Sequence, residues 1–193
     1  MKGINRAVMN ERQQFSKSKK PCVFLSHRSV DKKTVDDIAN YIQNAGIDIY
    51  LDSLDVQLQI ATKQSDAQKM TACIQRGISE STHVLCILSN QTFDDTSWWV
   101  PYEIGFSDSV KMNITLFKIK AEREYQIPAY LLIKEVIENI SGMNDYLKRL
   151  KLLDGTTIIE ETFSTDYSSK LQRGIDSILK SSPVSHPLRN VLK

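Results

Sequence analysis

One carboxylate in an aromatic stretch is the residue of this sequence best suited to carry chemistry. The stretch Trp98-Trp99-Val100-Pro101-Tyr102-Glu103-Ile104-Gly105-Phe106 holds both tryptophans of the chain and places Glu103 among aromatic and aliphatic neighbours. On a helix, Trp99, Glu103 and Phe106 would share one face because of their spacing. An ionised carboxylate is costly to bury on such a face, so its presence needs a reason.

Two readings of Glu103 remain open at this point. In the structural reading, an arginine or a backbone group elsewhere in the fold neutralises the carboxylate. In the functional reading, the carboxylate lies beside an aromatic wall and binds a cationic or hydroxylated ligand. Pro101 is tolerated only in the first turn of a helix, so we expect the helix to begin near Trp98 or Trp99. Glu103 then lies in the first or second turn, where the helix dipole favours its ionised form.

Short apolar runs alternate with helical patterns along most of the chain. The apolar runs suit strands buried on both faces and cover residues 22–25, 47–51, 83–88 and 113–119. Helical spacing predicts helices from about residue 31 to 45, 65 to 80 and 98 to 110, whereas 56–62 lacks periodicity and is read as a loop. Ser65 and Gln68 form a possible capping box at the start of the second of these helices.

The pattern weakens towards the C-terminus. Four further segments are read as a short strand or turn, a helix, a short strand and a helix, at residues 127–131, 144–153, 156–159 and 165–179. The alternation of strands and helices predicts an α/β fold with a doubly wound parallel sheet of about five strands and helices on both faces.

Polar side chains follow three of the expected strands. Ser26-His27-Arg28, Asp52-Ser53 and Ser89-Asn90 each come directly after a strand, and Glu103 follows the third strand at the start of its helix. The ligand crevice of a doubly wound sheet lies beyond the carboxyl ends of the strands. We therefore expect Glu103 and these three clusters to line one crevice.

Composition and motifs argue against several function classes. The 193 residues are 41% hydrophobic and 25% charged with a net charge of +2, and a basic leader precedes a mildly acidic body, so we expect no nucleic-acid binding. No apolar run is long enough to cross a membrane, and three scattered cysteines favour a reducing, cytoplasmic setting without a disulfide framework or metal site. Dinucleotide-binding glycine loops, P-loops and nucleophile elbows are absent from the sequence.

The remaining polar groups suit a ligand with a phosphate arm, a sugar and a flat base. Arg28 could pair with phosphate in a two-pronged way, and Trp99 could stack on the base or face a cation. Glu103 could hydrogen-bond ribose hydroxyls and stabilise an oxocarbenium-like transition state at the anomeric carbon. Nicotinamide in NAD⁺ is a cationic leaving group that needs little acid catalysis, so a single carboxylate could suffice.

Four segments, in order and at suitable spacing, resemble signatures of the TIR (Toll/interleukin-1 receptor) domain family. Val23 to His27, followed by Asp31-Lys32, is similar to the first strand and its Ser-His step. Gly46 to Asp52 resembles the second strand and the start of the BB loop, and Ile78 to Ser89 resembles the third-strand segment. Trp99 to Ile104 is similar to the Trp-x-x-x-Glu element of NAD-cleaving members. The resemblance covers about residues 21–150.

The resemblance implies a flavodoxin-like fold and NAD⁺ glycohydrolase or cyclase activity. Stand-alone bacterial members of the Thoeris kind make a cyclic or modified ADP-ribose messenger that switches on a separate effector in anti-phage defence. Glu103 would be the catalytic residue, NAD⁺ the substrate, and no cofactor or metal would be needed. Self-association through TIR–TIR contacts is also implied. The substrate-binding residues would be Ser26, His27, Arg28, Asp52, Ser53, Leu54, Ser89, Trp99 and Tyr102.

The chain departs from the family pattern in two ways, and two rival functions remain. Residues 53–65 lack the Pro-Gly type turn of the BB loop, and the family's aromatic third signature is not evident. One rival is a non-catalytic TIR adaptor, although an adaptor has no need of Glu103. The other is a nucleoside deoxyribosyltransferase-like enzyme, a group similar in fold that uses a glutamate in a setting like Glu103-Ile104-Gly105.

Four parts are expected along the chain. They are a basic, solvated and partly helical extension at 1–20, a TIR domain at 21–153, a strand and helix extension packed on it at 154–180, and a tail at 181–193. Adjacent helical positions point about 100° apart, so the two tryptophans cannot face one pocket. We expect Trp99 at the pocket wall and Trp98 in the core or at an interface.

Overall fold

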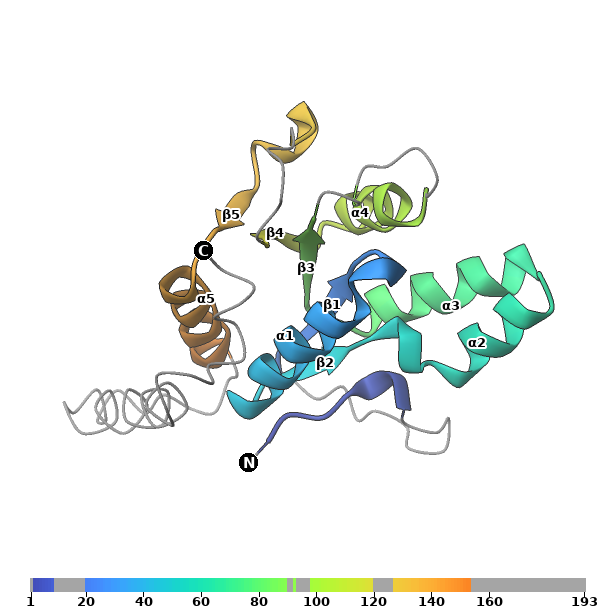
Figure 1. Cartoon of the computed structure of the whole chain (residues 1–193), viewed down its shortest axis with the longest axis horizontal. Coiled ribbons are helices and arrows are strands. Elements are labelled where there is room, and N and C mark those ends of the chain that lie inside the picture. Colours follow the sequence, from blue (N-terminus) through green and yellow to red (C-terminus); the bar gives the residue numbers. More distant parts are fainter. Residues whose placement is uncertain (1, 9–19, 90–91, 93–97, 120–126, 154–193) are drawn as a thin grey trace.

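The centre of the molecule is a five-stranded, all-parallel sheet (Figure 1). The computed structural model describes residues 2–8, 20–89, 92, 98–119 and 127–153. The strands are β1 (Cys22–Ser26), β2 (Asp48–Tyr50), β3 (His83–Leu88), β4 (Asn113–Lys118) and β5 (Glu135–Ile137). Their spatial order is β2-β1-β3-β4-β5. This is the flavodoxin-like order, in which the chain reverses direction across the sheet between β1 and β3, so the predicted fold class is confirmed.

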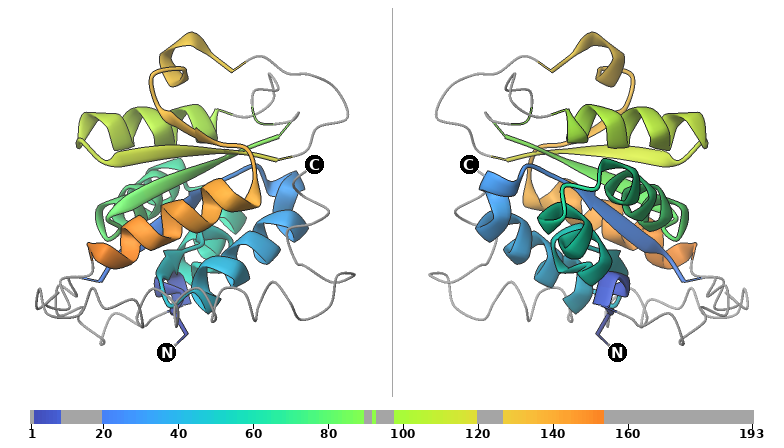
Figure 2. Two further views of the ribbon diagram at one scale, coloured as in Figure 1. Left: turned by 90° about the vertical axis from the view of Figure 1, so that its left-hand side faces the viewer. Right: turned by 90° about the vertical axis from the view of Figure 1, so that its right-hand side faces the viewer.

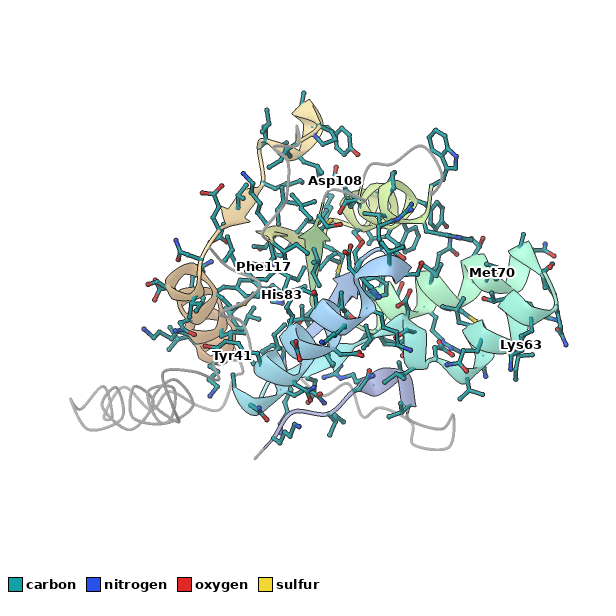
Figure 3. All side chains as sticks on the ribbon, in the orientation of Figure 1. Tyr41, Lys63, Met70, His83, Asp108 and Phe117 are labelled. Carbon is teal, nitrogen blue, oxygen red and sulfur yellow. The ribbon has the colours of Figure 1, made fainter. Side chains whose placement is uncertain are left out.

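Helices cover both faces of this sheet (Figure 2). On one face lie α1 (Lys32–Asn44) and α5 (Ile140–Leu152), and on the other lie α3 (Ala67–Ser79) and α4 (Trp99–Ser109). A further helix, α2 (Val56–Lys63), packs on α3. Tyr41 of α1 reaches towards α5 (Figure 3), where its hydroxyl donates to Asn144 Oδ1 at 2.6 Å. Both faces of β1 and β3 are thereby buried, which is why these strands read as continuous apolar runs.

The four strands predicted from apolar runs are confirmed, but β5 lies where no strand was predicted. Its three residues, Glu135–Ile137, pair with β4 alone at the edge of the sheet. A strand this short carries too few positions for alternation to be recognised. The segment 127–131, read as a strand or turn, contains the 3₁₀ turn η4 (Ala129–Leu131).

The segment 56–62 was predicted to be a loop, and this is wrong. Asp55 accepts hydrogen bonds from the backbone amides of Gln57 and Leu58, so it caps the start of α2. Among the residues of α2 only Ala61 is fully buried, because the helix packs on another helix rather than on the sheet. A helix with so little buried surface shows no apolar stripe in its sequence.

Two predicted helix starts are also corrected. The Ser65–Gln68 capping box is wrong, because Ser65 adopts a left-handed φ of 53° and Asp66 instead accepts from the amide of Lys69 at 3.0 Å. The last described helix, α5, begins at Ile140 rather than near 144, since Asn139 caps it by accepting from Gly142 N at 2.8 Å. The capping residues, Asp66 and Asn139, lie before the first apolar residue of each helical pattern, so the pattern alone did not locate the helix start.

The described part of the N-terminal leader is tied to the sheet edge rather than solvated along its length. The amide of Ile49 donates to the carbonyl of Ile4 at 2.9 Å, and Asn5 pairs with Ile49 in the parallel direction. Arg6 is buried and donates to the carboxylate of Asp48 from two nitrogens, at 3.1 and 3.0 Å. The segment therefore covers the free edge of β2.

The remaining predictions on the termini lie outside the described residues. They concern the strand at 156–159, the helix at 165–179, the extension at 154–180 and the tail at 181–193. Among the described helices, none has the length and apolar character needed to span a membrane.

Candidate active site

A hydrogen bond between Ser26 and Glu103 defines the candidate site. Ser26 is the last residue of β1 and lies beside Cys86 of β3 in the parallel register. Glu103 projects from the second turn of α4, which follows β3. The Ser26 hydroxyl donates to Glu103 Oε2 at 2.6 Å, and both side chains are buried. The structure thus brings together the carboxylate and the first polar cluster at the carboxyl edge of the sheet, as the topology predicts.

Glu103, Trp99 and Phe106 lie on one side of α4, as their spacing in the confirmed helix predicts. They differ in burial, because Glu103 is buried against the sheet with Val100, whereas Trp99 is 36% exposed. Trp99 lies edge-on to Tyr102, and Tyr102 stacks on Phe106. On the helix, the carboxylate therefore lies between the buried stripe and the aromatic row.

Glu103 carries a neutral partner instead of a cationic one. Within the described residues, Glu103 forms no ion pair, and its side-chain partner is the Ser26 hydroxyl. Burial raises the pKa of Glu103 well above the ordinary carboxylate range, the negative charge of Asp52 raises it further, and the Ser26 bond lowers it in part. The expected preference of the helix dipole for the ionised form is outweighed by burial, since the side chain is only 2% exposed.

Asp52 and His27 lie on the same rim. Asp52 opens the 3₁₀ turn η3 (Asp52–Leu54) after β2, and its Oδ1 is 3.9 Å from Nδ1 of His27. That nitrogen lies 2.9 Å from the carbonyl of Leu25, so it carries the proton and donates to it. Asp52 Oδ1 and the Ser53 hydroxyl are buried and have no hydrogen-bond partner in the described part of the chain. Burial raises the pKa of Asp52, and His27 opposes this shift.

Other predicted site residues lie at more varied positions on this edge. Arg28 is buried directly after His27, and its carbonyl accepts from the amide of Asp31 at 2.9 Å. Ser89 follows β3 but is turned to Asp31, whose carboxylate accepts from the Ser89 hydroxyl at 2.6 Å. Leu54 is exposed at the end of η3. The roles of Arg28, Ser89 and Leu54 in substrate binding remain predictions.

The tryptophans differ in exposure in a way that corrects one expectation. Trp98 occupies the N-cap position of α4 and is 78% exposed, so it lies outside the core, and its place at an interface stays a prediction. Trp99 is 36% exposed and lies edge-on to Tyr102, and its role as a pocket wall stays a prediction. Tyr102 is turned towards α3, where its hydroxyl accepts from Gln75 at 2.6 Å.

The structure adds two residues that the sequence alone did not single out. Cys86 is buried next to Ser26, and both its burial and the charge of Glu103 raise the pKa of its thiol. Burial raises the pKa of the Tyr130 phenol, in η4 after β4, and the charge of the Cys86 thiol raises it further. The rule that site residues follow strand ends could have identified Tyr130, because η4 follows β4.

A hollow of about 500 Å³ lies at the opposite end of the strands. It is lined by residues that begin β3, β4 and β5, including His83 and Asn113, and by α5. Its carboxylate, Glu135, is already paired with Arg149. Within the described residues, no group of three or more His, Cys, Asp and Glu side chains could hold a metal ion. We therefore take the carboxyl edge, where Glu103 has no ion pair among the described residues, as the candidate site in preference to this hollow.

The family model of the TIR domain matches residues 23–144. The chain belongs to the TIR domain family. The matched segment runs from β1 into α5 and includes Ser26, Asp52 and Glu103. The recognition made from four short motifs is thus confirmed.

A named relative extends the comparison. The chain is 30% identical over 120 residues to the probable 3′ cyclic ADP-D-ribose synthase ThsB′ of Bacillus cereus (strain MSX-D12). The match spans 60% of this chain and 60% of that protein.

Two solved structures match the chain at low identity. The SEFIR domain of IL-17 receptor B matches at 12% identity with a TM-score of 0.49, covering 70% of this chain and 98% of that chain. The CMP N-glycosidase BcmB of Clostridium botulinum matches at 19% identity with a TM-score of 0.41, covering 68% of this chain and 98% of that chain.

Proposed function

We propose that this TIR domain cleaves the nicotinamide–ribose bond of NAD⁺, with Glu103 as the catalytic residue. One observation carries the proposal: Glu103 is buried against a neutral serine hydroxyl, and the described residues give it no cationic partner. A buried carboxylate without a counter-charge is costly for a folded protein. The cost is understandable if the missing positive charge arrives with the substrate.

NAD⁺ supplies that charge at the required place. Its nicotinamide nitrogen is cationic in the ground state, and positive charge moves to the anomeric carbon as the bond to nicotinamide breaks. A carboxylate fixed in a water-poor site stabilises such charge more strongly than water does. The Ser26 hydroxyl holds Glu103 Oε2 in one orientation, so little reorganisation is needed during the reaction.

The other rim residues complete the proposed substrate site. Ser26, His27 and Arg28 at the end of β1, together with Asp52, Ser53 and Leu54 of η3, would contact the nucleotide. Ser89 and Tyr102 would contribute to the same site, and Trp99 would form its aromatic wall.

Similarity to ThsB′ supports a narrower proposal about the product. We infer an ADP-ribose-type signalling molecule, cyclic or otherwise modified, that acts in anti-phage defence through a separate effector protein in the cytoplasm. The relative is a probable 3′ cyclic ADP-D-ribose synthase, and it is 30% identical to this chain over 120 residues. Self-association through TIR–TIR contacts would accompany this activity.

The test is nicotinamide release from NAD⁺ by the purified full chain, compared with the Glu103→Gln variant. Glutamine keeps the size of the side chain and can still accept from Ser26, so only the charge is lost. We expect the variant to release nicotinamide at least about 100-fold more slowly, the range seen when one electrostatic stabiliser is removed. Asp145→Asn, an exposed charge change on α5, is the matched control and should retain wild-type activity.

The outcomes separate the candidate functions. Equal rates for the wild type and Glu103→Gln would remove Glu103 from catalysis. Absence of nicotinamide release at every protein concentration would favour a non-catalytic TIR adaptor, and cleavage of nucleosides in place of NAD⁺ would favour a deoxyribosyltransferase-like enzyme. If self-association completes the site, the rate should rise faster than linearly with protein concentration, and strict proportionality would contradict that part of the proposal.

A further inference from the structure

Asp52 and Glu103 are two carboxylates of one site in unlike surroundings. Glu103 is 2% exposed and holds the Ser26 hydroxyl at 2.6 Å. The Asp52 side chain retains 21% exposure, yet its Oδ1 is buried and has no hydrogen-bond partner among the described residues. Glu103 is thus enclosed and held by a donor, whereas the Asp52 carboxylate is partly open to solvent and its buried Oδ1 has no hydrogen-bond partner among the described residues.

The neighbours of Asp52 do not bond to that oxygen. Nδ1 of His27 is 3.9 Å away, beyond hydrogen-bond distance, and already donates to the carbonyl of Leu25. The hydroxyl of Ser53, next in the chain, has no hydrogen-bond partner in the described part of the structure either. Asp55, the other acid near this turn, is held by Arg76 at 2.8 Å and by Tyr50 at 2.6 Å. Asp52 is therefore the acid of this turn that remains available to a ligand.

Burial of Asp52 favours proton uptake. It raises the pKa of the carboxyl, whereas the charge of His27 and a hydrogen bond from the backbone of Ser53 lower that pKa, and the charge of Asp55 raises it by a smaller amount. Asp52 in turn raises the pKa of Glu103, with Cys86 and Ser26 as the other titratable or polar groups packed against that carboxylate. A carboxylate with a raised pKa is a better proton acceptor near neutral pH than an ordinary one.

Transfer of a glycosyl group to a hydroxyl requires two catalytic roles, one as the leaving group departs and one as the acceptor attacks. One group stabilises positive charge at the anomeric carbon, and another takes the proton of the incoming hydroxyl. Glu103, enclosed and oriented by Ser26, suits the first role. The second role needs an oxygen that can meet a water molecule or hydroxyl, which the enclosed Glu103 cannot easily offer.

We propose that Asp52 is the general base that accepts the proton of the acceptor hydroxyl, an inference that rests on the proposed function. In the step, the bond between C1′ of ribose and the nicotinamide nitrogen breaks, and its electron pair leaves with neutral nicotinamide. A lone pair of the acceptor oxygen forms the new bond to C1′. The acceptor O–H bond breaks, and its proton passes to the carboxylate of Asp52. The acceptor is water for a linear product or a hydroxyl of the same nucleotide for a cyclic one.

Base exchange separates this role from that of Glu103. In base exchange, isotope-labelled nicotinamide attacks C1′ through a nitrogen lone pair and regenerates labelled NAD⁺. The attacking nitrogen loses no proton, so the exchange reaction needs Glu103 but no general base. We expect Asp52→Asn to exchange labelled nicotinamide within a few fold of the wild-type rate. The same variant should form linear and cyclic ADP-ribose about 100-fold more slowly, the usual contribution of a general base.

Azide gives a second readout, because it can restore a folded variant that lacks only the base but cannot restore a misfolded one. The azide anion adds to C1′ without losing a proton, so it should restore nicotinamide release, with azido-ADP-ribose as product, in Asp52→Asn and Asp52→Ala. It should not restore Glu103→Gln. Asp145→Asn should match the wild type in exchange, product formation and azide response.

The results distinguish failure of this inference from failure of the proposed function. If Asp52→Asn lowers exchange and product formation in equal proportion, or changes neither, the general-base role is overturned while NAD⁺ cleavage stands. If azide fails to restore the Asp52 variants although the wild type accepts azide, the role is again overturned. If the wild type shows neither exchange nor product, or Glu103→Gln retains both, the proposed function itself falls and this inference falls with it.

Discussion

The hydroxyl of Ser26 donates to Glu103 Oε2 at 2.6 Å and joins two residues that are 77 positions apart in the chain. The bond crosses from the end of β1 to the second turn of α4, so it depends on β1 and β3 being neighbours in the sheet. It is a neutral donor against a buried acid, and it stabilises the ionised form of Glu103 against the effect of burial.

Loss of the Ser26 hydroxyl should move the acid limb of the activity profile to higher pH. The hydrogen bond lowers the pKa of Glu103, so Ser26→Ala should raise that pKa and leave less ionised carboxylate at a given pH. We expect about 10-fold lower activity at pH 7, equivalent to one lost hydrogen bond of ordinary strength. The measurement is kcat/KM for nicotinamide release as a function of pH.

Two variants give this prediction its controls. Ser109→Ala removes an exposed hydroxyl of α4, one that bonds the carbonyl of Phe106, and should leave the profile unchanged. In Asp52→Asn, with activity measured as nicotinamide exchange, the acid limb should move to lower pH. The reason is that the charge of Asp52 raises the pKa of Glu103, so its removal lowers that pKa. A shift in the same direction for Ser26→Ala and Asp52→Asn would contradict the electrostatic account.

Glu103→Gln should lose activity and gain stability. Because burial raises the folded-state pKa of Glu103 above its unfolded value, the folded state is penalised as the pH rises from the unfolded pKa through the folded one. The neutral glutamine removes this penalty, so we expect a gain of about 0.5–2 kcal/mol at pH 8 by urea unfolding. The gain should shrink towards zero below about pH 4, where glutamate is protonated in both states. A variant that is less stable than the wild type at pH 8 would show that the carboxylate serves the fold.

Arg6→Met should strongly destabilise the domain. Arg6 donates twice to Asp48, and both side chains are buried, so removing the cation leaves an uncompensated buried charge. The expected loss is about 3–5 kcal/mol in urea unfolding. Arg149→Met, which breaks the exposed pair with Glu135, should cost less than about 1 kcal/mol. If Arg6→Met lowered the free energy of unfolding as little as Arg149→Met, the N-terminal leader would contribute little to the stability of the fold.

Two helical glycines should respond to alanine with opposite signs. A Cβ at Gly77 would lie 2.4 Å from Cε1 of Tyr50, so Gly77→Ala must displace that ring and should cost about 1–3 kcal/mol. A Cβ at Gly105 meets nothing within 4 Å, and Gly105→Ala should stabilise α4 by about 0.5–1 kcal/mol. Thermal unfolding of the two variants measures both effects. The arrangement of α3 on β2 would be contradicted if Gly77→Ala were neutral.

Local patterns sufficed for much of the fold. Cys22 to Leu25 and His83 to Leu88 are continuous apolar runs because both faces of β1 and β3 are covered by helices. Pro101 placed the start of α4 correctly, since proline is accepted only in the first helical turn. Patterns failed at α2 and β5, where few side chains are buried against the sheet and the sequence carries little periodic signal.

The sequence by itself determined the family, the positions of the four central strands along the chain and the identity of Glu103 as an acid among apolar neighbours. These are local properties, since they depend on residue types and on spacings of a few positions. The tertiary structure alone decided that Glu103 meets Ser26, that the charge of Asp52 acts on the same carboxylate, and that Arg6 holds Asp48 at the sheet edge. Such partners lie far apart in the chain and meet only through the order of the strands, so no local pattern could reveal them.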